Sequence, residues 1–201
     1  MSQIQVRKME QDNLSSVVEV HLKAFNGFFL TFLGPAFLLV LYRSILFDPS
    51  GISFIAEDHG QIVGFVAGTA EPNGFYHRLL KKHWWDFARA STNALFHKPS
   101  ILWRLLRAFS LPNKELPAAK CGTLMSIAVD PHYQNQGLGK KLIENFLMNA
   151  SEQGLEYINL TTDARNNDAT NLFYCSLGFK FCSSYITQEG RAMNEYLIHL
   201  K

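Results

Sequence analysis

A glycine-containing segment at residues 129–141, between an apolar strand and an amphipathic helix, has residue types suited to binding an anion. The start of a helix exposes backbone N–H groups without partners and the positive end of the helix dipole. Gly137 and Gly139 carry no Cβ atom that would keep a ligand away from these N–H groups. The segment is therefore predicted to bind a phosphate group.

The spacing of this segment excludes two common phosphate loops. A nucleotide P-loop requires G-x-x-x-x-G-K followed by Ser or Thr, and a dinucleotide loop requires a third glycine where Leu142 stands. What remains is Q-x-x-G-x-G, formed by Gln134, Gly137 and Gly139. Alone, this pattern is equally typical of an ordinary loop before a helix, so its meaning depends on the segments around it.

Two neighbouring segments point to the same family as the loop. The Q-x-x-G-x-G spacing resembles the acetyl-CoA signature of the GNAT N-acetyltransferase superfamily, and the preceding strand ends in Ala-Val-Asp-Pro, as such strands commonly do there. Residues 167–179 resemble the family segment N-x-x-A-x-x-x-Y-x-x-x-G-F. The motif resemblance covers residues 124–179, whereas the N-terminal third fits only in the order of its elements.

The resemblance implies an enzyme that transfers an acetyl group directly from acetyl-CoA to an amine. Backbone groups of the strand would pair with the acyl and pantetheine groups, and N–H groups of the glycine loop would hold the pyrophosphate. The acetyl-CoA contacts that the resemblance implies are Ile127, Ala128, Val129, Gln134, Asn135, Gln136, Gly137, Leu138, Gly139, Lys140, Asn167 and Tyr174.

The same chemistry needs an acid and an acceptor for the amine proton. The resemblance implies that Tyr174 protonates the departing CoA thiolate as general acid, the alternative being that its ring only packs against CoA. For the base, Glu71 at the end of a predicted strand is the first expectation. Asp163, His21 and ordered water are alternatives, and each of these side chains would otherwise have a surface or structural role.

Hydrophobic periodicity predicts the elements that position these residues. Strands are predicted at 4–9, 52–56, 62–70, 123–129, 157–162, 179–187 and 191–199, and helices at 14–25, 36–47, 138–153 and 169–176. The strand–helix–strand order around the loop predicts a parallel crossover in a mixed α/β sheet. With the resemblance, this predicts one domain over 1–201: a GNAT-like mixed, partly splayed sheet flanked by helices, with a helical insertion between the third and fourth strands.

Residues 71–120 form this insertion, in which basic and aromatic side chains alternate. It is open to three interpretations: a solvated helical lid, an acceptor site for acidic substrates such as nucleotide sugars, or a membrane-surface patch. Residues 28–35 resemble GNAT members of bacterial surface-sugar pathways, which favours an amino-sugar nucleotide as the small-molecule amine acceptor. A protein or peptide amine, and a non-catalytic acyl-CoA-binding module, are the alternatives. The apolar segment 28–47 is either core or the interface of a homodimer.

Composition restricts the remaining choices. The chain has 201 residues, of which 47% are hydrophobic and 18% charged, enough for a hydrophobic core. Its net charge of +2 gives no reason to expect nucleic acid. Three cysteines without zinc-type spacing predict neither a metal site nor a disulfide framework, and favour a cytoplasmic protein. We see no signal peptide and no apolar run long enough to span a bilayer.

Overall fold

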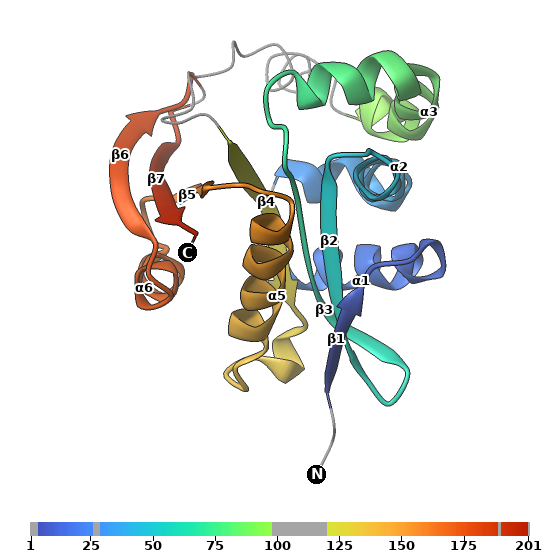
Figure 1. The fold of residues 1–201 in the computed structure, drawn as a ribbon. Coiled ribbons are helices and arrows are strands. Elements are labelled where there is room, and N and C mark those ends of the chain that lie inside the picture. Colours follow the sequence, from blue (N-terminus) through green and yellow to red (C-terminus); the bar gives the residue numbers. More distant parts are fainter. Residues whose placement is uncertain (1–3, 26–28, 98–119, 189, 201) are drawn as a thin grey trace.

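The computed structural model describes residues 4–25, 29–97, 120–188 and 190–200, which form an open sheet with helices on both faces (Figure 1). In spatial order its seven strands are β1 (Gln5–Lys8), β2 (Gly51–Asp58), β3 (Gln61–Thr69), β4 (Cys121–Val129), β5 (Tyr157–Asp163), β7 (Ala192–His199) and β6 (Lys180–Ile186). β4 and β5 pair in parallel and the other neighbouring strands pair antiparallel. The predicted mixed α/β sheet with a parallel crossover is therefore confirmed.

Helices cover the two faces of the sheet and form two hydrophobic cores. Val17 and Phe37 belong to the core that α1 and α2 build against one face, and Leu142 and Phe146 belong to the core that α5 builds against the other. All four side chains are at most 1% exposed, and burying each contributes roughly 1.5–3 kcal/mol. The helices are α1 (Leu14–Ala24), α2 (Gly34–Leu46), α3 (Phe75–His97), α5 (Leu138–Glu152) and α6 (Asp168–Ser176), with short 3-10 helices η1 (Gln11–Asn13), η2 (Phe29–Leu33) and η3 (Pro131–Tyr133).

The sheet is splayed between β4 and β5. These strands pair only where Cys121–Thr123 faces Tyr157–Asn159. Beyond Thr123 the two strands separate, and the remainder of β5 pairs with β7 instead. Figure 1 shows β4 and β5 diverging, with α5 alongside β4. One edge of β4 is therefore left without a strand partner among the described residues, as the predicted splay requires.

The helix α3 accounts for the described part of the predicted insertion. It contains a backbone kink at His83 and packs on α2, where the ring centroids of Phe87 and Phe37 are 5.2 Å apart. Trp84 and Trp85 stack on each other and are half or more exposed. The rest of the insertion, residues 98–119, lies outside the described residues, so its form and the one-domain organisation stay predictions. None of the helices described here has the length and apolar character needed to cross a bilayer.

Candidate functional site

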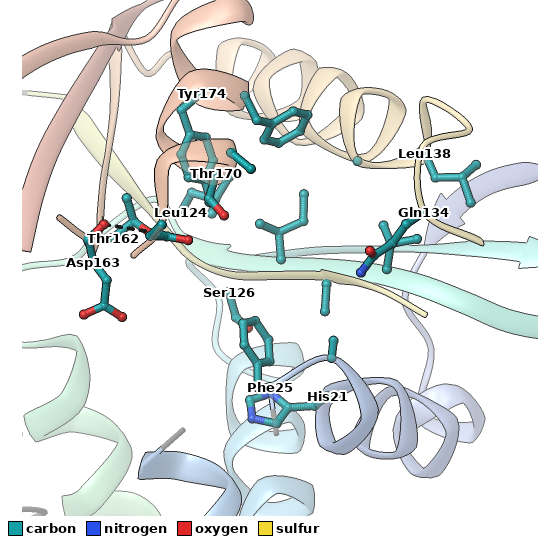
Figure 2. Close-up of a pocket in the computed structure, with 18 of the residues that line it drawn as sticks. His21, Phe25, Leu124, Ser126, Gln134, Leu138, Thr162, Asp163, Thr170 and Tyr174 are labelled. Carbon is teal, nitrogen blue, oxygen red and sulfur yellow. Dashed lines mark hydrogen bonds between the residues drawn. The ribbon is translucent and has the colours of Figure 1, made fainter. Parts of the chain in front are cut away.

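A pocket of about 920 Å³ opens where β4 and β5 separate. The segments that line it are α1, the start of η2, β4, the loop before α5, the start of α5, the end of β5, α6 and the beginning of β7 with the residue before it. Figure 2 shows Tyr174 and Thr170 approaching from α6, Gln134 and Leu138 from the loop, and His21 and Phe25 from α1 on the opposite side of β4. This volume is in the range of pockets that hold cofactors and small substrates, about 300–1,000 Å³.

The loop before α5 presents the start of that helix to the pocket. Gly137 is the N-cap residue with a left-handed backbone (φ 77°), and Asn135 is left-handed as well (φ 60°). The first helical hydrogen bond runs from the N–H of Lys141 to the carbonyl of Gly137 at 3.1 Å. The N–H groups of residues 138–140 therefore have no partner within the helix, which suits the start of α5 to binding an anion.

The pocket includes most of the residues predicted to bind acetyl-CoA from this loop. Gln136 is the exception, because it is exposed and does not line the pocket. Lys140 adds a positive charge at the pocket wall, although its ammonium is also 3.8 Å from the carboxylate of Glu144. The lining residues of the loop and of the first turn of α5 are Gln134, Asn135, Gly137, Leu138, Gly139 and Lys140.

The two glycines differ in their surroundings, which adds to the expectation that both admit an anion. A Cβ atom on Gly137 would meet no atom within 4 Å, so this position requires glycine for its left-handed backbone. A Cβ atom on Gly139 would lie 3.1 Å from Cζ of Phe173. Gly139 therefore allows α6 to pack closely against α5, and thereby positions the neighbouring Tyr174.

An ion pair anchors the loop to α1. Asp130 is almost fully buried, accepts a hydrogen bond from the N–H of His132 at 3.0 Å, and contacts the Lys23 ammonium at 2.9 Å. The hydrogen bond from Lys23 holds the pKa of Asp130 below its usual range. Sequence reasoning identified Asp130 only as part of the strand-end motif, because its partner is more than a hundred residues away.

The free edge of β4 supplies the second wall. Ile127, Ala128 and Val129 line the pocket, as the resemblance implied. Beyond Thr123 their strand pairs with no other described strand on the β5 side, so backbone N–H and C=O groups on this edge are available to a ligand. An extended ligand can therefore add along β4 like a further strand.

Asn167 lies at the N-cap position of α6 without a capping hydrogen bond from its side chain. Its amide donates instead to Oγ1 of Thr162 at 2.8 Å and to the carbonyl of Asp163 at 3.1 Å. Asn167 thus ties the start of α6 to the end of β5, and it also lines the pocket. Thr170, another lining residue, stands where the family segment has alanine.

Tyr174 is held between apolar and aromatic neighbours. Its side chain lines the pocket but is only 6% exposed, and its ring packs against Phe173, Phe179 and Tyr196. Burial raises the pKa of Tyr174 to about 12. The phenol is therefore protonated at neutral pH and has a proton to donate, as a general acid must.

The three side chains considered as the base have different surroundings in the structure. Glu71 lies outside the pocket, largely exposed, with its carboxylate 3.8 Å from Arg78. Asp163 lines the pocket, but its two oxygens bind the Arg191 guanidinium at 3.1 and 2.7 Å. His21 lines the pocket and is 2% exposed, and burial lowers its pKa to about 4. The geometry therefore gives no support to Glu71 as the base.

Ser126 and Arg191 are among the lining residues that were not identified from the sequence. Ser126 of β4 is hydrogen-bonded to Tyr42 of α2, and Arg191 of the β6–β7 connection pairs with Asp163. Neither belongs to a motif, and both reach the pocket through tertiary contacts, so no local signal could have found them. The described residues contain no group of three or more His, Cys, Asp or Glu side chains arranged to hold a metal ion.

Sequence comparisons relate the chain to a known family. A model of the acetyltransferase (GNAT) family matches residues 16–179. The ribosomal protein bS18-alanine N-acetyltransferase of Escherichia coli strain K12 is 38% identical over 90 residues, which are 43% of this chain and 58% of that enzyme. The similarity thus spans little more than half the length of the curated relative.

Solved structures share the fold over nearly the whole chain. The crystal structure of the ribosomal-protein-S18-alanine N-acetyltransferase from Escherichia coli has a TM-score of 0.62 at 18% identity and covers 99% of this chain and 95% of that one. The PaiA N-acetyltransferase from Thermoplasma acidophilum, solved in complex with coenzyme A, has a TM-score of 0.54 at 13% identity, with 96% and 98% covered. At these identities the likeness establishes the fold alone.

Proposed function

The chain belongs to the acetyltransferase (GNAT) family, and on this premise we propose that it transfers the acetyl group of acetyl-CoA directly to a primary amine in the pocket beside β4. One observation carries the proposal. A single pocket of about 920 Å³ is lined by the anion-binding loop, by the free edge of β4 and by Tyr174. These are the three parts that a long, phosphorylated thioester donor requires: a phosphate site, a strand edge and a proton donor.

In the proposed complex, the donor lies along the gap between β4 and β5. Its pyrophosphate accepts hydrogen bonds from the free N–H groups at the start of α5, with Lys140 close by. Its pantetheine amides pair with the open edge of β4 at Ile127–Val129. Asn167 borders the same path, because its side chain fixes α6 to β5 at the pocket wall.

Tyr174 is the proposed general acid. The attack of the amine on the thioester carbon forms the new C–N bond, and cleavage of the C–S bond then releases the CoA thiolate. Tyr174 lines the pocket and is protonated, since burial raises its pKa to about 12. A phenol in this state can give its proton to the departing sulfur and recover it from water.

We propose that water, rather than a side chain, takes the amine proton. The Glu71 carboxylate lies outside the pocket, and that of Asp163 is engaged by Arg191. The pKa of His21, about 4, makes this imidazole a weak base at neutral pH. The amine must therefore arrive in its neutral form, so the acid limb of kcat/KM against pH should follow the pKa of each amine tested.

For the acceptor we propose a small amine, with amino-sugar nucleotides as the first class to test. The second candidate is the N-terminal amine of a protein, which is favoured by the 38% identity with an enzyme named for the alanine of ribosomal protein bS18. The two classes differ in what surrounds the amine: phosphates and hydroxyls in one, an extended peptide in the other.

A turnover assay with different amines distinguishes the two candidate classes of acceptor. The chain is incubated with acetyl-CoA and a panel of amino-sugar nucleotides, short peptides with free N-termini and simple amines, and release of the CoA thiol is recorded together with the mass of the product. Acetylated sugar nucleotides without acetylated peptides would support the first class, and the reverse result the second. Binding of acetyl-CoA without turnover of any amine would instead support a non-catalytic binding module.

A further inference from the structure

Three polar side chains form a hydrogen-bonded chain that begins at the half-buried Ser126 in the pocket and continues to two buried residues. Oγ of Ser126 is 3.1 Å from Oη of Tyr42, which is 2.7 Å from Nδ1 of His21. Tyr42 and His21 are 1% and 2% exposed, and Ser126 and His21 line the pocket. Figure 2 shows Ser126 on β4 between Tyr174 of α6 and His21 of α1. Burying polar groups costs free energy. A hydrogen-bonded chain of side chains that ends at a pocket wall therefore suggests a role in binding a ligand there.

A β-bulge in β4 turns Ser126 towards this chain. In the β3–β4 register Leu124 faces Gly68 and Ser126 faces Ala67, so Met125 has no partner. In a regular strand Leu124 and Ser126 would share a face. Because of the bulge, Leu124 packs in the core under α5, whereas Ser126 bonds to Tyr42 on the α1 and α2 side. Bulges characteristically re-aim a side chain in this way.

The protonation states of His21 and Tyr42 determine which group donates in each hydrogen bond of this chain of side chains. Burial lowers the pKa of His21 to about 4 and raises the pKa of Tyr42 well above its usual range, so both are neutral at pH 7. An imidazole nitrogen is a stronger acceptor than a phenol oxygen, so the Tyr42 O–H donates to Nδ1 of His21. The Ser126 O–H then donates to Tyr42, which leaves the lone pairs of the serine oxygen facing the pocket.

Neighbouring aromatic rings pack against Tyr42 and His21. Phe65 packs edge-on against Tyr42 with ring centroids 5.0 Å apart, and Phe25 lies against His21 at 4.6 Å. In the direction given above, Nε2 of His21 carries the ring proton. This atom is buried and has no hydrogen-bond partner among the described residues. The serine oxygen is therefore the end of the chain that a ligand in the pocket can use.

We propose that Ser126 accepts a hydrogen bond from the attacking amine, and that Tyr42 and His21 are positioning residues that keep its hydroxyl proton turned away from the pocket. A thioester carbonyl only accepts hydrogen bonds, whereas a neutral primary amine donates them. The serine oxygen thus matches the amine and not the acetyl group. The serine oxygen would thereby orient the neutral amine, and this inference rests on the proposed acetyl transfer.

Kinetics with glucosamine and L-alaninamide as amine probes test the inference. Ser126→Ala should raise the KM for the amine about 3- to 10-fold, the effect of one hydrogen bond, and leave the KM for acetyl-CoA unchanged. Tyr42→Phe should act in the same direction but have no further effect in the Ser126→Ala background. Ser126→Thr keeps the hydroxyl and should restore the amine KM. An unchanged amine KM in Ser126→Ala, or additive effects in the double variant, would overturn the inference.

Ser50→Ala is the matched control. Ser50 is a buried serine that bonds to Thr69 at 2.8 Å and to Asp48 at 2.6 Å, outside the pocket lining. It reports the cost of removing a buried hydroxyl without touching the pocket, so its amine KM should stay at the wild-type value. Calorimetry with acetyl-CoA on every variant tests the donor site separately, so a failure of the proposed function is distinguishable from a failure of the inference.

A second measurement needs no turnover. The ¹⁵N chemical shifts of the imidazole nitrogens in the ligand-free protein report which nitrogen of His21 carries the proton, and His21→Gln assigns the signals. The inference requires the proton on Nε2. A proton on Nδ1 would overturn it, because Tyr42 would then donate to Ser126 and the serine hydroxyl would turn towards the pocket as a donor.

Discussion

At the scale of single residues, Tyr174 is the proposed donor of the proton to the departing sulfur. Replacement by Phe keeps the ring among its aromatic neighbours and removes only the hydroxyl. We expect kcat to fall about 100-fold, in the range that general acid catalysis provides, because the CoA thiolate would leave unprotonated. Steady-state kinetics give kcat, and calorimetry should show acetyl-CoA affinity within about threefold of wild type.

Tyr157→Phe is the control for this change. Tyr157 lies on β5, packs edge-on against His199 and does not line the pocket. Its kcat should equal that of the wild type. If Tyr174→Phe kept more than half of the wild-type kcat, the phenol would only pack against the donor.

Asp130 gives a second prediction at this scale, which concerns stability against pH. The Lys23 ammonium holds its folded-state pKa below the unfolded value, so the pair adds stability above the unfolded pKa and loses it as pH falls through the folded one. The free energy of unfolding of the wild type should therefore fall more steeply than that of Asp130→Asn between about pH 5 and pH 2. Urea titrations across this range measure both slopes, and equal slopes would contradict the assignment.

The predicted site residues that lie in the pocket lining include several from motifs that are local in the sequence. Gln134, Gly137 and Tyr174 belong to motifs with fixed spacing, and all line the pocket. Glu71 was chosen because it ends a strand, but spacing along the chain does not tell which end of a strand meets the pocket. The partnership of Ser126 with Tyr42 spans 84 positions and could only come from the folded chain.

At the scale of elements, the bulge in β4 depends on the glycine opposite. A Cβ atom on Gly68 would collide with the carbonyl oxygen of Thr123 and lie 2.7 Å from Cζ of Phe146. Gly68→Ala should therefore destabilise the protein by about 3 kcal/mol, since β3 cannot move away from both β4 and α5. Chemical denaturation measures the loss.

Gly64→Ala, on the same strand, is the matched comparison. Its closest contacts would be 3.1 Å, to the Ala128 carbonyl and to Leu142, so a smaller loss of about 1 kcal/mol is expected. Equal stability losses for the two variants would show that the bulge does not depend on a close approach at Gly68.

Periodicity located the elements well. Every strand and helix predicted for the described residues is present, with bounds that differ by a few residues. The position of β7 between β5 and β6 was not predicted, because a hairpin can join a sheet by either of its strands. The bulge at Met125 was missed as well, since an extra residue in a strand leaves its hydrophobic pattern almost unchanged.

At the scale of the whole molecule, the sheet consists of two parts joined at β4 and β5 by a short parallel ladder. Acetyl-CoA in the proposed position would contact β4 on one side of the gap and α6 on the other. It should therefore stabilise the folded protein, by about 2.7 kcal/mol at a concentration 100 times its dissociation constant. Thermal unfolding with and without acetyl-CoA measures this, and an unchanged Tm at saturation would contradict the proposed position.

The central claim is that the start of α5 holds the pyrophosphate, and calorimetry with acetyl-CoA on Gly137→Glu tests it most directly. Gly154→Glu is the matched control, because Gly154 has the same φ of 77° and equally open space around its missing Cβ, but lies at the far end of α5. Both variants carry the same strain and charge, and only Glu at position 137 would meet the pyrophosphate. We predict that Gly137→Glu loses acetyl-CoA binding and that Gly154→Glu retains it. Equal binding by the two variants would contradict the assignment of the loop and, with it, the proposed position of the donor.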